Sequence, residues 1–239
     1  MKNEKLVEKL SIIGQKIGEN KYLQSISQGV MKVLPILIIG AFASLFAGLP
    51  IEAWQAVIKE TGALGCLNAI VSATTNLLGL FFTYSISKTL AEKLGIKAGI
   101  VPLLSLVVYV GLLPLSATQE GVSFLAFDYL GTKGMIVGIL ISLLVCHLYK
   151  FITDKNVVIK MPQGTPQYVS DSFTSLIPAF IVVILTMCIR LLFAITPYND
   201  AFNCIYSLLQ IPLTVLIGGS LFANIIIAFL TQVNWFLGI

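Results

Sequence analysis

Charged residues are scarce in this sequence. Asp, Glu, Lys and Arg make up 11% of its 239 residues, whereas hydrophobic residues make up 57%. A soluble domain carries about 25% charged residues, so too few are present here to cover a surface exposed to water. We therefore expect most of the surface to face lipid. The formal net charge of +4 does not indicate nucleic-acid binding, and the placement of the charges is more informative than their sum.

Motifs for catalysis and for cofactor binding are also missing. The sequence has no glycine-rich phosphate loop of the GxxxxGK type, no HExxH and no GxSxG. Its eleven acidic residues fall in predicted loops or surface helices, and none pairs with another across a predicted span. Cys66, Cys146, Cys188 and Cys204 are far apart, so we interpret them as packing residues rather than disulfides or metal ligands. We expect no cofactor, no metal and no catalytic residue, and a membrane-embedded enzyme is not favoured.

The first 29 residues are hydrophilic and contain no short apolar core before a cleavage site, so we expect no secretory signal peptide. Leu6, Leu10, Ile13 and Ile17 recur at helical spacing, with lysines on other faces, which predicts an amphipathic helix. We expect this helix to lie on the cytoplasmic membrane surface. Packing against a neighbouring subunit is the alternative.

Six apolar runs predict membrane-spanning helices. They are Val33–Ile51, a run within Thr61–Ser87, Ala98–Gln119, about Lys133–Lys150, about Phe173–Thr196 and Ser220–Ile239. A second amphipathic helix is predicted over 201–217, and we expect it to lie flat, although a seventh span is the alternative. The fold class is thus an all-α polytopic membrane protein with about six transmembrane helices and two interfacial amphipathic helices. The expected units are a cytoplasmic segment (1–29), a five-span scaffold (30–196), an interfacial linker helix (197–219) and a first transport-domain helix (220–239).

The placement of lysines predicts how the chain crosses the membrane. With the amino terminus inside, the inside segments hold twelve lysines, whereas the outside loops hold only Lys59 and Lys133. Cytoplasmic loops of membrane proteins carry an excess of Lys and Arg. We therefore expect a multi-pass protein with a cytoplasmic amino terminus.

Polar residues inside the apolar runs are the candidates for function. Small and polar residues recur at helical spacing in the second run, where close helix packing is favoured and a cavity lining is the alternative. They are Ser72, Asn76, Gly79, Thr83 and Ser87. His147, the one histidine, ends the fourth run and is interpreted as a polar anchor at the membrane interface rather than a proton carrier.

Arg190 is the one full charge well inside an apolar run. An intramembrane arginine is a functional hypothesis, although Pro197 is only about two turns away and the side chain could reach the interface. Asn224, Gln232 and Asn234 lie close together in the last run. Such amides either bond to another helix or line a polar cavity.

The connector before the fifth run is polar and marked by prolines. Pro162 and Pro166 hold the residues before them extended, and Gly164 permits a tight turn between them. Hydroxyl and carboxyl side chains at 170–172 can cap a helix that opens at Phe173, with Pro178 early enough in it to be tolerated. The pattern predicts an extended loop, a cap and then a new membrane helix.

Several short motifs, spread over essentially the whole chain, are informative in combination. They are Lys16-Ile17, Asn20–Leu23, Val33–Gly40, Leu130–Met135, Met161-Pro162, Pro166, Val169-Ser170, Ser172-Phe173, Leu176–Pro178, Gln210–Leu213 and Trp235–Ile239. In combination they resemble the membrane-spanning IIC component of bacterial sugar phosphotransferase systems, of the lactose/cellobiose (diacetylchitobiose) type.

The resemblance implies a sugar permease in the bacterial inner (plasma) membrane. Such a subunit carries a disaccharide such as cellobiose, lactose or chitobiose for phosphorylation by a cytoplasmic IIB partner, in a phosphoenolpyruvate-dependent system that also contains IIA. It implies a homodimer formed by the first five spans. The chain would be the transport subunit of a sugar phosphotransferase without a catalytic residue of its own.

The resemblance also implies that the site continues past this sequence. In the family, the run corresponding to Trp235–Ile239 is followed by His-Gly, and that histidine belongs to the sugar site, whereas this sequence stops at Ile239. We therefore expect most of the sugar-binding domain to be lacking, with Asn224, Gln232 and Asn234 as candidates for the edge of the sugar path. The alternative function is a truncated dimerisation scaffold that does not transport.

Overall fold

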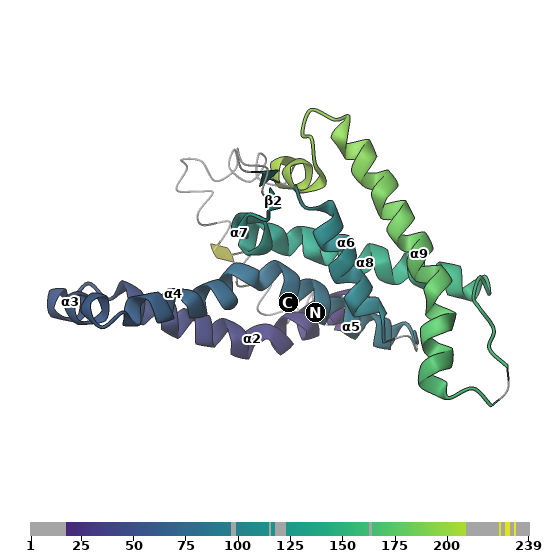
Figure 1. The fold of residues 1–239 in the computed structure, drawn as a ribbon, viewed down its shortest axis with the longest axis horizontal. Coiled ribbons are helices and arrows are strands. Elements are labelled where there is room, and N and C mark those ends of the chain that lie inside the picture. The colour runs from purple at the N-terminus through teal and green to yellow at the C-terminus, as the bar shows by residue number, and fades with distance from the viewer. Residues whose placement is uncertain are drawn as a thin grey trace, which may run out of the picture.

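The computed structural model describes residues 18–96, 99–114, 116–117, 123–162 and 164–208, together with positions 225, 228, 229 and 232. Helices dominate this part of the chain, with one two-residue strand pair (Figure 1). In chain order the elements are α2 (Lys21–Gly48), α3 (Glu52–Glu60), α4 (Ala63–Ala73), η1 (Thr75–Leu77), α5 (Leu78–Lys93), α6 (Val101–Leu112), β1 (Ser116–Ala117), β2 (Ser123–Phe124), α7 (Phe127–Leu130), α8 (Thr132–Asp154) and α9 (Gln167–Ala194). The strands pair antiparallel, Ser116 opposite Phe124.

Four stretches of the described part are long and apolar enough to cross a membrane. They are Lys21–Gly48, Ala63–Lys93, Thr132–Asp154 and Gln167–Ala194. These confirm the all-α polytopic membrane fold. The predicted third span is a shorter helix, because α6 has only 12 residues, about 18 Å at 1.5 Å per residue. Of the predicted sixth span, only positions 225, 228, 229 and 232 are described, and they are helical; the amphipathic pattern at residues 6–17 lies outside the described residues.

α2 begins twelve residues before the apolar run that predicted it. The Asn20 side chain caps it by accepting from the backbone N–H of Tyr22 at 2.9 Å, so the helix crosses the expected boundary at residue 29. α4 and α5 return antiparallel along α2, with α3 at the tip of this arm (Figure 1). The predicted second span is therefore not one uniform helix, because the short 3₁₀ turn η1 interrupts it.

The stripe of small residues on α5 packs against α8. A Cβ on Gly138 of α8 would approach the Gly79 carbonyl to 2.9 Å, so the two helices are almost in backbone contact here. The Ser142 hydroxyl donates to the Thr83 carbonyl at 2.9 Å, and the Cys146 thiol contacts the Ser87 carbonyl at 3.4 Å. The stripe is thus a close-packing surface for three of its members. Polar groups that bond across helices are typical of membrane interiors.

α9 begins six residues before the predicted apolar start. Pro166 occupies its N-cap in an extended conformation, and no side chain caps the helix. The prediction that Ser170, Asp171 or Ser172 is the cap is therefore wrong. Because the Pro166 carbonyl already accepts from the Ser170 N–H at 3.1 Å, the first turn closes without side-chain help.

Two other features of this connector can be compared with their predictions. Gly164 has a φ of +96°, which confirms the turn expected there. Pro178 lies in the interior of α9 rather than near its start. It cannot donate to the carbonyl one turn before it, and α9 bends part-way along its length (Figure 1).

A short helical segment at 201–208 returns to the core. Asp200 caps it by accepting from the Asn203 N–H at 2.7 Å. Phe202 is buried and meets Tyr109 and Tyr129 edge-on, with ring centroids 5.1 and 5.9 Å apart. This is the beginning of the predicted second amphipathic helix, and its continuation over 209–217 lies outside the described residues.

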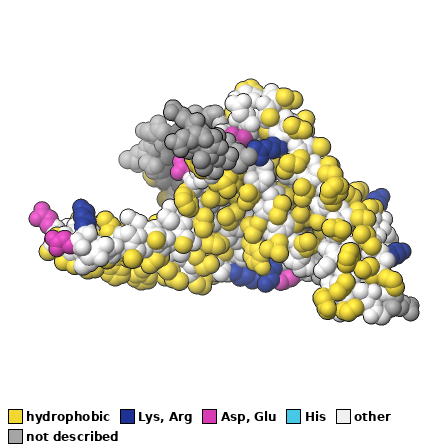
Figure 2. Space-filling model, in the orientation of Figure 1, with side chains coloured by type: hydrophobic (Ala, Val, Ile, Leu, Met, Phe, Trp, Pro, Cys, Tyr) yellow, Lys and Arg dark blue, Asp and Glu magenta, His cyan; other side chains and the backbone are white. Residues whose placement is uncertain are grey.

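Hydrophobic atoms cover most of the face seen in Figure 2. On α2 alone, Met31, Ile39, Phe42 and Leu45 are each more than half exposed. A water-soluble monomer rarely exposes contiguous apolar surface of this extent. The exposed side chains therefore fit a lipid environment.

Candidate functional site

The amides predicted for the sugar path are only partly placed. Asn224 and Asn234 lie outside the described residues. Gln232 is helical and exposed. All three remain predictions from sequence polarity.

Arg190 has a defined partner. It is half-buried on α9, and its guanidinium donates to the Gly111 carbonyl near the end of α6. The last carbonyls of a helix have no partner within the helix and carry partial negative charge. Arg190 thus joins α9 to the C-terminal end of α6, a contact that neither sequence interpretation included.

His147 joins α8 to the start of α2. Its Nδ1 lies 2.7 Å from the Leu143 carbonyl, which can only accept, so Nδ1 carries the hydrogen. In the neutral ring Nε2 then accepts from the Tyr22 hydroxyl at 2.9 Å, and the two rings stack with centroids 5.2 Å apart. This geometry fits a polar anchor.

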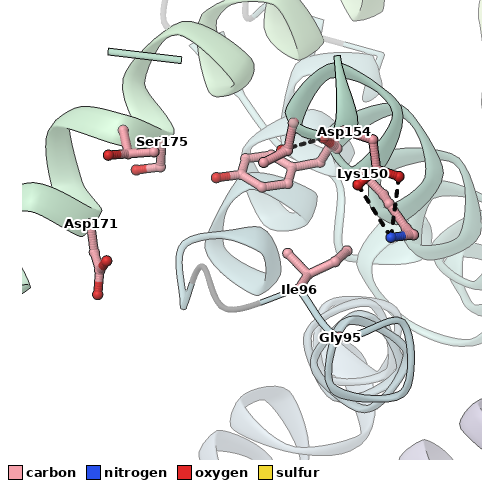
Figure 3. Close-up of a pocket in the computed structure, with 9 residues that line it drawn as sticks. Gly95, Ile96, Lys150, Asp154, Asp171 and Ser175 are labelled. Atoms are coloured by element: carbon pink, nitrogen blue, oxygen red, sulfur yellow. Dashed lines mark hydrogen bonds and ion pairs between the residues drawn. The ribbon is translucent and has the colours of Figure 1, made fainter. Parts of the chain in front are cut away.

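A cavity with several polar side chains in its wall lies between the end of α8 and the start of α9. Its volume is about 270 Å³. It is lined by Gly95, Ile96, Tyr149, Lys150, Thr153, Asp154, Asp171, Thr174 and Ser175. Figure 3 shows Asp171 and Ser175 of α9 on one side, Lys150 and Asp154 of α8 on the other, and the loop at Gly95 and Ile96 below them.

The charges in this cavity are unevenly paired. Lys150 and Asp154 form an ion pair at 3.2 Å one helical turn apart. Within the part of the chain that the structure describes, Asp171 has neither an ion pair nor a side-chain hydrogen bond. A carboxylate, an ion pair and four hydroxyl groups can bind polar groups, but they include no nucleophile aligned with a base. The described residues also contain no group of three potential metal ligands.

A second polar cavity, of about 230 Å³, lies at the other end of α8. Lys133 pairs there with Asp128 of α7 at 3.6 Å and lies over the Tyr206 ring at 5.7 Å. Lys133 and Lys150 are 17 residues apart, about 26 Å along a helix. This separation is close to the ~30 Å hydrocarbon core of a bilayer, as expected for lysines at opposite interfaces.

Sequence reasoning missed the α8–α9 cavity. A signal was present, because Lys150 and Asp154 are spaced one turn apart and Asp171 follows just after the connector. What the sequence did not show was that α9 starts early enough to place Asp171 and Ser175 opposite α8.

Comparison with known proteins identifies the family. Residues 27–239 match the family model described as "Phosphotransferase system, EIIC". The chain belongs to this EIIC family. It is 31% identical to the lichenan permease IIC component of Bacillus subtilis (strain 168), over 99% of this chain and 55% of that protein. It is also 31% identical to the cellobiose-specific EIIC component of Geobacillus stearothermophilus, over 98% of this chain and 54% of that protein.

A solved EIIC structure has the same fold. The crystal structure of the transporter ChbC, the IIC component from the N,N'-diacetylchitobiose-specific phosphotransferase system, superposes with a TM-score of 0.83 at 30% identity. The match covers 98% of this chain and 57% of ChbC. The chain thus spans a little over half the length of the EIIC proteins that it matches.

Proposed function

We propose that the chain belongs to a sugar permease of a phosphoenolpyruvate-dependent phosphotransferase system. Its substrate would be a disaccharide such as cellobiose, lactose or chitobiose. The observation that carries this proposal is the fold match to a chitobiose IIC component over nearly the whole chain, at 30% identity. Relatives whose names specify cellobiose and lactose support the same substrate class.

The proposed partners are a cytoplasmic IIB, which phosphorylates the sugar, and a IIA that supplies IIB. This chain would provide part of the sugar path, and the phosphoryl-carrying group would belong to IIB. We place it in the bacterial inner membrane with the amino terminus in the cytoplasm. The twelve lysines predicted inside against two outside support this orientation.

In this orientation the α8–α9 cavity opens to the cytoplasm, because Lys150 and Lys155 are on the predicted inner side. The cavity around Lys133 then faces outward. A second copy of the chain is the proposed partner within the membrane. Exposed apolar side chains along α2, such as Phe42 and Leu45, support a membrane-facing or subunit-facing surface there.

We propose that Asn224, Gln232 and Asn234 form the edge of the sugar path. Their support is the polarity of three amides in an otherwise apolar run. Buried amides bind sugar hydroxyls as both donors and acceptors. Arg190 is not included, because its guanidinium already binds Gly111.

The test is uptake of radiolabelled cellobiose by bacteria that lack their own cellobiose IIC but retain IIA and IIB. Cells producing the chain should accumulate phosphorylated cellobiose, and cells that also lack IIB should not. The Q232A/N234A variant should raise the KM for uptake about tenfold, as expected for the loss of hydrogen bonds to the sugar. The matched control is N68A on α4, where the amide is exposed.

Two outcomes would count against the proposal. Absence of uptake, combined with co-purification with a full-length IIC and inhibition of its transport, would favour a dimerisation scaffold. Uptake that does not need IIB would point to a carrier of another class. Equal KM values for Q232A/N234A and N68A would remove the amides from the sugar path but leave the transport proposal standing.

A further inference from the structure

A groove on the membrane-facing surface lies between α2, α5 and α6. Its volume is about 550 Å³, and most of its lining is apolar. It is lined by Lys32, Val33 and Ile36 of α2, by Leu80, Phe81, Tyr84, Ser85 and Lys88 of α5, and by Leu106 of α6. None of these residues takes part in the proposed sugar path.

The two ends of this groove differ in chemistry. Leu80 and Phe81 lie eight and seven residues before Lys88 on α5, so the apolar end is about 12 Å from the charged end. The Lys32 ammonium donates to the Thr89 hydroxyl at 2.9 Å. Lys32 therefore extends along α2 toward the turn of α5 that carries Lys88, and both positive charges gather at one end.

The ion pairs Lys133 with Asp128 and Lys150 with Asp154 include neither of these lysines. Glu92 is one turn beyond Lys88 on α5 but forms no ion pair with it. In the view of Figure 2, Lys and Arg atoms gather near the start of α2, beside hydrophobic surface and beside Asp or Glu atoms. Two unpaired ammonium groups beside an apolar groove call for a ligand with an anionic head and an apolar tail.

We propose that this groove binds an anionic phospholipid, with its phosphate against the ammonium groups of Lys32 and Lys88 and an acyl chain along Ile36, Leu80 and Phe81. Basic pockets between transmembrane helices on the cytoplasmic side are suited to anionic headgroups. Tyr84, 38% exposed, adds a hydroxyl donor near the lysines. A sugar fits less well, because the groove offers few hydrogen-bonding groups beyond these.

A second copy of the chain is a less suitable occupant. Covering the groove with an apolar helix would bury two ammonium groups without a counter-charge, which is costly. Side chains at the rim, including Leu103 and Val107 of α6, are more than half exposed and continue the apolar surface. Lipid can cover this surface while its headgroup neutralises the lysines.

Native mass spectrometry of the full chain in zwitterionic micelles tests the proposal, with phosphatidylglycerol, phosphatidylcholine and inorganic phosphate as probes. Phosphatidylglycerol should bind more tightly than phosphatidylcholine. Its Kd should rise about fivefold in K88Q and about 10- to 30-fold in K32Q/K88Q, in line with the contribution of a lysine near an anionic membrane surface. K155Q/K160Q removes the same charge on the same predicted side but outside the groove, and should leave the Kd within twofold.

The apolar half is tested separately. L106W keeps both lysines but obstructs the proposed position of the acyl chain. Phosphatidylglycerol should therefore bind more weakly, while the binding of inorganic phosphate is unaffected. Because Lys88 makes no bond within the described residues, K88Q should keep the wild-type thermal stability. Equal effects of K88Q and K155Q/K160Q on the Kd for phosphatidylglycerol would overturn the proposal. So would inorganic phosphate competing fully with the lipid, or lipid bound to monomers and excluded from dimers.

Discussion

The contact between α2 and α5 can be tested with one methyl group. Gly29 of α2 is buried against Ile86 of α5. A Cβ added at Gly29 would lie 2.6 Å from Ile86 Cγ1, 2.8 Å from its Cα and 3.0 Å from its backbone N. The side-chain atom can rotate away, but the backbone atoms cannot. Restoring ordinary van der Waals separation from 2.8 to 3.4 Å requires the helices to move apart by about 0.6 Å.

This movement also lengthens an interhelical hydrogen bond. The Ser85 hydroxyl donates to the Gly29 carbonyl at 2.8 Å. Overpacking costs about 1–3 kcal/mol, and weakening a buried hydrogen bond adds up to about 1 kcal/mol. Alanine recovers up to about 1 kcal/mol through its better helix propensity. We therefore expect G29A to lower the free energy of unfolding by about 1–3 kcal/mol.

The assay is unfolding of the purified chain in mild micelles, followed by circular dichroism during titration with a denaturing detergent. G48A is the matched control, because Gly48 ends the same helix and a Cβ there meets nothing within 4 Å. G29A/I86A should not recover the loss, since the contact with the Ile86 backbone persists and truncating the buried Ile86 side chain is itself destabilising. If G29A unfolds at the same detergent concentration as G48A, the close backbone approach of α2 and α5 is not present in the membrane protein.

Three further changes test other contacts by the same unfolding assay. R190M removes the donor to the Gly111 carbonyl and should lower the free energy of unfolding by about 1–3 kcal/mol, whereas R190K should recover about half of this loss. Equal free energies of unfolding for both variants would refute a role of Arg190 in joining α9 to α6. Y109F leaves the Tyr129 carbonyl, bound at 2.7 Å, without its donor and should cost about 1–2 kcal/mol; no loss would mean that this bond is absent. G164A forces a side chain into a φ of +96° and should increase proteolytic cleavage of the α8–α9 connector relative to G65A, since Gly65 lies in open space; equal cleavage would contradict the strained turn.

The sequence was sufficient to predict the class of fold. Scarce charge and runs of about 20 apolar residues leave few alternatives to membrane helices. It also predicted the function of the stripe on α5, because small residues at helical spacing permit a close approach between membrane helices. Gly79 and Thr83 do meet α8, at Gly138 and Ser142.

Helix ends were less predictable, because apolar periodicity does not mark where backbone hydrogen bonding starts. α9 begins at Gln167 among polar residues, since the fixed backbone of Pro166 starts the first turn before the apolar run. α6 stops at Leu112, before the uncharged run that predicted it has ended. In both cases local backbone geometry determined the end of the helix, and hydrophobicity only indicated its centre.

The partners of polar side chains were not predictable, because they lie far apart in sequence. Arg190 binds a carbonyl 79 residues away, and His147 binds Tyr22 across 125 residues. The α8–α9 cavity likewise depends on how two helices meet across the connector. One sequence shows that such residues are polar and inside an apolar run, but not which backbone group satisfies them.

The hydrogen bonding of the described helices limits where a sugar can pass. A sugar path needs donors and acceptors that are free to exchange partners. Among the described residues no buried side-chain nitrogen or oxygen lacks a hydrogen-bond partner. Thr83, Ser105, Ser142 and Thr186 are buried, and each donates to a helix carbonyl. These helices therefore fit a closely packed scaffold, with the two cavities described above near the ends of α8. We expect the sugar path to depend on residues beyond the described core, beginning with the amides near Gln232.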